Sequence, residues 1–336
     1  MTEASLTEAI TRRRYHGLYL SRQCPDIVDL SRELLGLHCW FHRNVAFSAL
    51  IRGADLSGWK SALTKTWLYR GTLHGAAYDE LPRLLSLHRD GESWLRRSYS
   101  EQMLSDVADK VVRCMEDGVH SRAEMRKIFA YDYEPKVIEA MFSPWGGIFV
   151  YLAGLGKVAF RDMASRDFDL IDAEPAGTRT EVLPEMLRRY FKAYGPATLD
   201  DAAWFFGFWR EDRKMLRAFP LDEYDRFELD GRVYYRCGEP DGMDDLPEFN
   251  LLSGFDPIIV SYTERSAVLP AEYKRSVILK SGICLPTVAV NGKVAGLWNI
   301  KKGEPVVEFF KKQPKRIESG VLDLVDSIHW HITGRL

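Results

Sequence analysis

The feature that most limits how this chain can fold is a recurring order of two short helices followed by a two-stranded hairpin. In its clearest copy, Thr198 is a suitable N-cap, and the helix that it starts is predicted to end near Gly207. A second helix is predicted over about residues 210–218. The stretch FELDGRVYYR then alternates around an Asp-Gly pair, which strongly indicates a β-hairpin. Two helices and a hairpin in this order are typical of a winged helix.

Two earlier segments follow the same order with weaker signals. In the segment that starts at His120, Ser121 and Glu124 form a capping-box pattern that predicts the start of a helix. Pro135 opens a turn or a second helix, and KVAFRD is predicted to be a strand. Near the N-terminus three helices and then two strands are predicted, in the order CPDIVDLSRELLGLH, FHRNVAFSALIRG, LSGWKSA, TWLYRG and TLHGAAY. We therefore expect three winged helices in tandem, a topology that serves either DNA binding or protein contacts.

The C-terminal part differs, because β-branched residues dominate it from FDPIIVSY onward. A hairpin is predicted around Asn291-Gly292, EPVVEFF is predicted as a further strand, and residues 318–332 are predicted as a last helix. We expect a small, strongly twisted sheet or a partly closed barrel. The fold class is therefore α+β, with three winged helices and a β-rich, barrel-like C-terminal domain. The expected winged helices span residues 1–90, 91–178 and 179–240, and the C-terminal domain spans residues 241–336.

Composition narrows the class of protein. The chain of 336 residues contains five Cys, an odd number with no CxxC pair, which argues against a disulfide framework and a thiolate zinc site. No run of about 18 apolar residues exists, so we expect no membrane span, and the N-terminal charges are in the wrong order for a signal peptide. A cytoplasmic location is expected. The net charge of −2 still allows DNA binding, because only the facing surface must be basic.

The stretch LLGLHCWFHRN concentrates residue types that carry chemistry. His38 and His42 are four apart, so on a continuous helix they would share one face. That spacing is a weak metal signal, because the Glu of the metalloprotease motif is missing, and we expect no metal. A glycine-rich phosphate loop, a GxSxG elbow and the zinc deaminase pattern are all missing from the sequence.

The longer pattern is more informative. LLGLHCWFHRN is followed by TWLYRGTLHGAAYDELPRL, GPATLDDAAWFFG, LLSGFDPIIVSYTERSAVLP and LPTVAVNGKVAGLW. Together these segments resemble the tandem winged-helix DNA glycosylases, a family that includes the bacterial enzyme that unhooks azinomycin-type interstrand crosslinks. The resemblance covers about residues 10–300, and RGTLH, FDP and LPTVAVNGKVAG occur in the family's order.

The resemblance implies a C-shaped protein around a basic channel that binds double-stranded DNA. It implies removal of N7- or N3-alkylated purines, or of interstrand crosslinks, by hydrolysis of the N-glycosidic bond without a metal or an organic cofactor. A monomer is expected. The family's catalytic motif reads Gln-x-Gln or Gln-x-Asp, with His as an occasional first residue, and here His38, Cys39 and Trp40 stand at those positions.

This departure from the motif leaves two alternatives open. Glycosidic cleavage passes through an oxocarbenium-like state, and a cationic alkylpurine leaves readily, so the site needs mainly a positioned water and an acceptor. Neutral His38 can accept a hydrogen bond from that water, whereas protonated His38 cannot. Trp40 is a donor only, which suits it to stacking or to closing the pocket. The chain is therefore either a glycosylase with reduced or altered activity, or a DNA-binding lesion sensor or regulator without hydrolysis.

Other residues in the family-matching segments are candidate DNA contacts. Arg43 and Asn44 follow the motif and suit phosphate or sugar contacts. Asp256 precedes a Pro and is expected to orient Arg265 or Tyr262, or to have a structural role. The remaining candidates lie on or beside the first predicted wing, or in the C-terminal segments: Arg70, Thr72, His74, Arg265 and Lys293.

Overall fold

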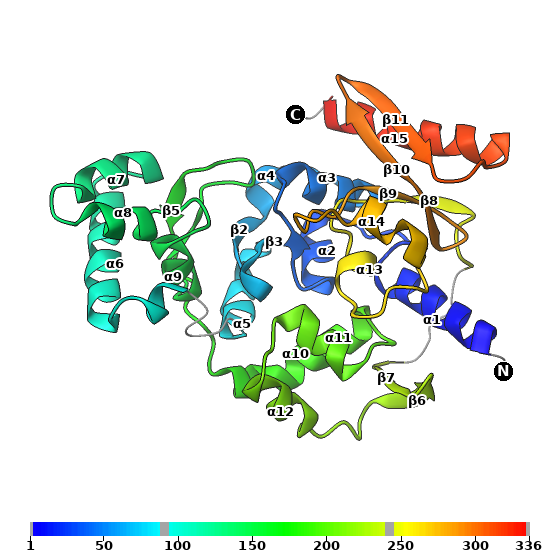
Figure 1. The fold of residues 1–336 in the computed structure, drawn as a ribbon, viewed down its shortest axis with the longest axis horizontal. Coiled ribbons are helices and arrows are strands. Elements are labelled where there is room, and N and C mark those ends of the chain that lie inside the picture. Colours follow the sequence, from blue (N-terminus) through cyan, green and yellow to red (C-terminus); the bar gives the residue numbers. More distant parts are fainter. Residues whose placement is uncertain (1–2, 88–93, 239–244, 334–336) are drawn as a thin grey trace. The chain divides into compact units, whose positions relative to one another are not determined.

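The computed structural model describes residues 3–87, 94–238 and 245–333 (Figure 1). The chain divides into two compact units. Met1–Ser57 and Glu185–Leu336 form the first, here called the terminal unit, and Gly58–Pro184 forms the second, here called the inserted unit. The expected domain boundaries after residues 90 and 240 fall outside the described residues.

The terminal unit begins with α1 (Glu3–Gly17), which the sequence reading did not predict. The helix α2 (Ile27–Glu33) starts where the Asp26 carboxylate accepts hydrogen bonds from two backbone amides at 2.8 and 2.9 Å. The short strand β1 (Leu37–His38) and the helix α3 (His42–Ile51) follow.

The stretch between α2 and α3 corrects one prediction. Leu35 and Gly36 have positive φ values of 57° and 100°, and the Gly36 amide donates to the Ser31 carbonyl at 2.7 Å. This is a Schellman-type helix end, so α2 stops before the histidines. His38 then lies on β1 and His42 begins α3, so the two side chains do not share a helical face.

The clearest predicted helix pair and hairpin are confirmed. They comprise α11 (Leu199–Phe206), α12 (Glu211–Arg217), β6 (Asp225–Leu229) and β7 (Arg232–Arg236). The helix α10 (Arg179–Ala193), which was not predicted, precedes them. Thr198 and Asp201 form a reciprocal capping box with both distances at 3.0 Å, and Gly207 ends α11 with a φ of 75°. Asp230 and Gly231 both have positive φ, which is what a tight hairpin turn requires.

The C-terminal part is a four-stranded antiparallel sheet in the order β11-β10-β9-β8, with α15 packed against it. The elements are β8 (Phe249–Leu252), β9 (Thr287–Val290), β10 (Lys293–Lys301), β11 (Glu304–Phe309) and α15 (Lys315–Thr333). Of the two expected alternatives, a small sheet or a partly closed barrel, the described strands form the sheet, which is open with β8 and β11 at its edges.

The segment between β8 and β9 also departs from its β-rich prediction. It contains α13 (Pro257–Val260), η4 (Ala271–Tyr273) and α14 (Lys274–Val277). The apolar run in α13 is helical because the Asp256 carboxylate caps it and Pro257 occupies its first turn.

In the inserted unit, the strands predicted for two different winged helices join into one antiparallel sheet, β3-β2-β4-β5. Lys65 on β2 pairs with Phe160 on β4. The core behind this sheet is rich in aromatic rings, and Phe149 and Phe168 stack with centroids 3.9 Å apart. The elements are α4 (Trp59–Ala62), β2 (Thr64–Trp67), η1 (Tyr69–Gly71), β3 (Leu73–Ala76), η2 (Tyr78–Glu80), α5 (Leu81–Ser86), η3 (Trp94–Arg97), α6 (Glu101–Glu116), α7 (Arg122–Phe129), α8 (Pro135–Met141), α9 (Ile148–Gly154), β4 (Val158–Phe160) and β5 (Phe168–Leu170).

A buried ion pair joins distant parts of the terminal unit. Arg52, just after α3, donates to both carboxylate oxygens of Asp256 at 2.9 and 3.2 Å, and both side chains are 0% exposed. The guanidinium also donates to the carbonyl of Leu18 after α1, and to the carbonyl and hydroxyl of Ser48 on α3. Asp256 accepts further hydrogen bonds from Ser253 and Ile258. The pair therefore holds α1, α3 and the loop before α13 together.

Replacing Asp256 with Asn should destabilise the terminal unit by about 3–5 kcal/mol, because it leaves a buried guanidinium without its counter-charge. Urea denaturation of the full chain would show this as a lower midpoint. Glu272→Gln, which breaks the exposed Lys311–Glu272 pair, is the matched control and should leave the midpoint unchanged. Equal shifts in the two variants would contradict the role assigned to the Arg52–Asp256 pair.

Candidate functional site

His38 is held by an aromatic ring and by the backbone that follows it. Its imidazole stacks on Phe255, with centroids 4.2 Å apart and planes at 11°. The Trp40 backbone nitrogen lies 3.5 Å from His38 Nδ1, which is a long and weak hydrogen bond. Cys39 is buried between them, while the Trp40 side chain is 39% exposed. The motif position thus presents one imidazole of fixed plane beside one accessible indole.

The loop that carries Phe255 is tightly constrained. Phe255 has a φ of 56°, a left-handed conformation that is costly for a bulky side chain. Its backbone nitrogen donates to the Cys284 carbonyl at 3.2 Å, and Asp256 next to it is fixed by Arg52. The sequence marks FDP only as a family-matching segment, because the stack of Phe255 on His38 joins residues far apart in the chain.

The two candidates after the motif differ in environment. Asn44 is 7% exposed and packs against Gly254, where an added Cβ would lie 2.8 Å from Asn44 Nδ2. Gly254 is therefore required for this close approach. Arg43, in the first turn of α3, is exposed, and its guanidinium has no ion-pair or hydrogen-bond partner among the described residues. Of the two, Arg43 is the one open to an anionic ligand.

Arg265 and Asp256 do not pair as expected. The Arg265 Nε donates to the carbonyl of Ile259 at 2.8 Å, and its guanidinium lies 5.7 Å from the centre of the Trp204 ring. Burial lowers the pKa of Arg265 from its ordinary value. The Tyr262 hydroxyl donates to a different carbonyl, that of Tyr194. Of the two roles expected for Asp256, the structural one is confirmed, because its partner is Arg52 rather than Arg265 or Tyr262.

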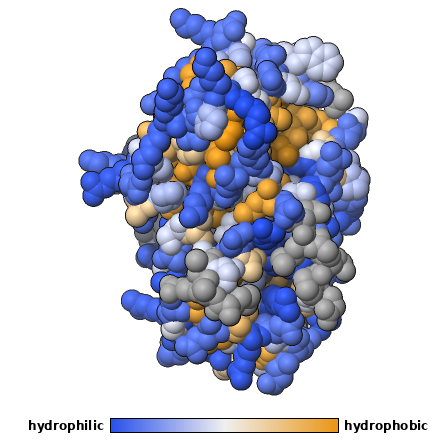
Figure 2. Space-filling view, turned by 90° about the vertical axis from the view of Figure 1, so that its right-hand side faces the viewer, coloured by the Kyte–Doolittle hydropathy of each residue, from blue (hydrophilic) through white to orange (hydrophobic). Residues whose placement is uncertain are grey.

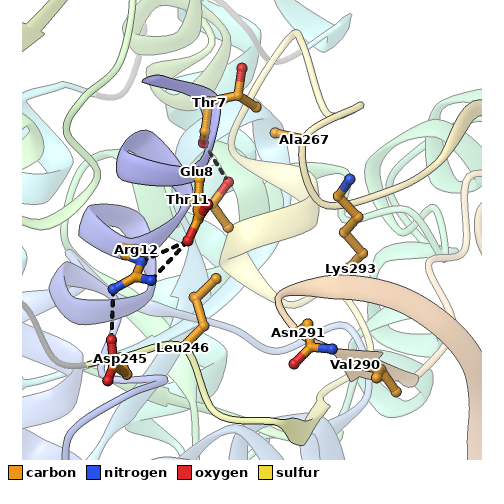
Figure 3. Close-up of a pocket in the computed structure, with 10 residues that line it drawn as sticks. All are labelled: Thr7, Glu8, Thr11, Arg12, Asp245, Leu246, Ala267, Val290, Asn291 and Lys293. Carbon is orange, nitrogen blue, oxygen red and sulfur yellow. Dashed lines mark hydrogen bonds and ion pairs between the residues drawn. The ribbon is translucent and has the colours of Figure 1, made fainter. Parts of the chain in front are cut away.

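Lys293 lines a cavity of about 1260 Å³ beside α1 (Figure 3). His38 is not among the described residues that line this cavity. Arg12 on its opposite side is neutralised by Glu8 at 2.8 Å and Asp245 at 2.7 Å. Lys293 itself has no charged partner among the described residues. The face of the molecule in Figure 2 is mainly hydrophilic, with apolar patches between the hydrophilic residues. The cavity is lined by Thr7, Glu8, Thr11, Arg12, Asp245, Leu246, Ala267, Val290, Asn291 and Lys293.

In the inserted unit, Arg70 and Thr72 lie in the turn between β2 and β3, and His74 lies on β3 directly after it. Arg70 has a φ of 56°, and the Thr72 hydroxyl donates to the Tyr69 carbonyl at 3.0 Å. His74 is 5% exposed, and its Nδ1 donates to the Thr72 carbonyl at 3.0 Å. Burial, followed by the nearby Arg70 charge, lowers the pKa of His74 to about 3. His74 is therefore neutral near pH 7 and supports the turn, and a DNA contact by these residues stays a prediction.

The described residues contain neither a metal-binding cluster nor a membrane-spanning helix. No group of three or more His, Cys, Asp and Glu side chains in those ranges is arranged to hold a metal ion, and none of the five cysteines forms a disulfide. Among the helices in the same ranges, none has the length and apolar character that crossing a bilayer requires.

Comparison with known proteins decides the family. A family described as "DNA glycosylase AlkZ-like" matches residues 60–323, which is most of the chain. The chain belongs to the AlkZ-like DNA glycosylase family. The match begins after His38, so the motif position lies outside the matched residues.

Two relatives of this AlkZ-like chain come from one organism. The interstrand DNA cross-link repair glycosylase of Streptomyces sahachiroi is 27% identical over 285 residues, which is 76% of this chain and 74% of the relative. The solved structure of Streptomyces sahachiroi DNA glycosylase AlkZ has a TM-score of 0.77 at 22% identity and covers 96% of both chains. The family resemblance predicted from the sequence and the α+β fold class are thus confirmed.

The buried His74 predicts acid sensitivity of the inserted unit. Its pKa is about 3 in the folded AlkZ-like chain and about 6.5 in an unfolded chain. Between these values only the unfolded state takes up the proton, so stability falls as the pH drops below about 6.5. Lowering the pH from about 7 to about 5 should reduce the free energy of unfolding of both proteins. The reduction should be about 1–2 kcal/mol smaller in His74→Gln than in the wild type.

Urea denaturation at both pH values measures this difference. His331→Gln, which changes a partly exposed histidine on α15, should lose as much stability as the wild type. An acid effect of the same size in all three proteins would show that His74 is not its source.

Proposed function

We propose that this AlkZ-like protein hydrolyses the N-glycosidic bond of alkylated purines, including interstrand crosslinks, in double-stranded DNA. The observation that carries the proposal is the stacked, oriented imidazole of His38 at the family's motif position. Membership in a family of DNA glycosylases supports the reaction class, and the crosslink repair glycosylase among its relatives supports the substrate class.

The reaction needs one proton acceptor. Alkylation at N7 makes the purine cationic, so the bond between N9 and C1′ breaks with its electrons passing to the base, which leaves neutral. Water then attacks the oxocarbenium-like sugar at C1′ and loses a proton. Neutral His38 accepts that proton and passes it to solvent. A protonated imidazole would repel the developing sugar cation, so the neutral form is the active one.

The contact between the Trp40 amide and His38 bears on which ring nitrogen can accept a hydrogen bond from the water. When Nδ1 accepts from the Trp40 amide, Nε2 carries the hydrogen and donates to a water rather than accepting from it. At 3.5 Å that contact is too weak to hold this tautomer. We propose that Nε2 accepts from the water in the tautomer with hydrogen on Nδ1, and that the Trp40 amide gives up its contact with Nδ1 when this tautomer forms.

Binding is assigned to residues that remain accessible. The exposed Trp40 indole would stack on a base or a sugar, and Arg43 and Lys293 would contact phosphates. Asn44 and Arg265 would shape the surface that supports the motif, because both are packed against the protein. Arg70, Thr72 and His74 would form a wing turn that approaches the DNA backbone.

The finer architecture belongs to the same proposal. Helix pairs followed by hairpins support three winged helices at about the predicted positions, residues 1–90, 91–178 and 179–240, before the C-terminal sheet at 241–336. A C-shaped arrangement around a DNA channel and a monomeric state are further parts of the proposal, and the family resemblance supports them.

A second candidate function has its own observation. Trp40 stands where the family has a second acceptor, and an indole donates but does not accept. A site with one acceptor fewer suits a protein that binds lesions without cleaving them.

The two functions separate in one experiment. Purified protein in excess over 7-alkylguanine duplex should create abasic sites, detected as alkali-labile breaks, and His38→Ala should lower the rate by about 10²–10⁴-fold. His331→Ala, a histidine on the surface of α15, is the control and should retain the wild-type rate. Salt-dependent duplex binding without breaks would favour the sensor, and loss of binding even at low salt would defeat both functions.

A further inference from the structure

Phe255 combines backbone strain with a contact to the motif. A non-glycine residue in the left-handed region is strained, and it persists only when its surroundings determine it. Phe255 adopts this conformation, with a φ of 56°, and its ring stacks on His38. A nearby aromatic, Phe41, lies farther off with ring centroids 6.4 Å from Phe255, and it is 46% exposed. The close and parallel contact is therefore the one with His38.

Contacts on both sides of Phe255 fix its conformation. Before it, Gly254 fits against the Asn44 side chain with no room for a Cβ. After it, the Asp256 carboxylate is held by Arg52 and by the Ser253 amide and hydroxyl. The loop is thus determined by buried polar contacts that do not involve the Phe255 ring. Of the ring contacts that Phe255 makes with His38 and Phe41, the one with the imidazole is the closer, at 4.2 Å between centroids.

We propose that Phe255 is a positioning residue that holds the plane of the His38 imidazole for attack by water. This inference rests on the proposed glycosylase function. Histidines in catalytic sites are commonly oriented by a hydrogen bond to one ring nitrogen, which also sets the tautomer. A stacked phenyl ring fixes the plane without binding either nitrogen. His38 can therefore exchange its proton between water and solvent while its orientation stays constant.

Three variants separate positioning from folding. Phe255→Tyr keeps the ring. Phe255→Asn removes the ring but suits the backbone, because Asn tolerates positive φ better than other non-glycine residues. Phe310→Leu is the matched control, because Phe310 stacks on Tyr273 at 4.3 Å rather than on His38.

Two readouts are needed. The first is the single-turnover rate of base release from 7-alkylguanine duplex at saturating protein, together with the Kd for that duplex. The second is the NMR signal of the His38 ring protons in histidine-labelled protein, assigned by its absence in His38→Ala. A phenyl ring stacked on the imidazole shifts these protons upfield, and this readout does not depend on turnover.

Phe255→Asn should lower the rate about 10–100-fold with the Kd within about twofold, because misplacement of a catalytic group acts on the chemical step. Its His38 signal should move downfield. Phe255→Tyr and Phe310→Leu should keep the wild-type rate within about threefold. An active, His38-dependent wild type with an unchanged rate in Phe255→Asn would overturn the positioning role alone. A wild type that releases no base would overturn both this role and the proposed function.

Discussion

The Arg52–Asp256 ion pair is the interaction on which the rest of the site depends. Burying two charges is costly, and such a pair contributes little net stability compared with apolar packing. Its effect is on geometry, because a buried ion pair is stable only when the two charges are in contact and their other polar atoms are hydrogen-bonded. Arg52 is bonded to Leu18 just after α1, to Ser48 on α3 and to Asp256. Asp256 is also bonded to Ser253 in its own loop. The position of Phe255 follows from this pairing.

Features that depend on neighbouring residues could be predicted from the sequence. The Thr198 capping box, the Asp-Gly and Asn-Gly hairpins and the α15 helix all rest on patterns within one turn or one helix. The family resemblance could be predicted as well, because it rests on an ordered set of short segments. The end of α2 was missed because Leu35, a bulky residue, takes the left-handed conformation that glycine usually supplies. The apolar run in α13 was read as β, although its Asp-Pro start favours a helix.

Contacts between distant segments could not be predicted. His38 and Phe255 stack, Arg52 pairs with Asp256, and β2 pairs with β4, yet no periodicity relates these residues. The chemistry of the motif depends on the same kind of contact. A pair of hydrogen-bonding side chains would orient a water by their own geometry. A histidine followed by a tryptophan lacks the second acceptor of that pair, and the positioning role proposed for Phe255 would supply orientation from outside the motif.

The division of the chain has a consequence for how it is made on the ribosome. The inserted unit, Gly58–Pro184, is complete once about half of the chain has been synthesised, whereas the terminal unit needs residues from both sides of it. Arg52 emerges 204 residues before Asp256, so its guanidinium stays hydrated while the intervening residues are translated. Domains generally acquire structure in the order in which they are completed. The site around His38 is therefore assembled late, after the segment that carries Phe255 has emerged.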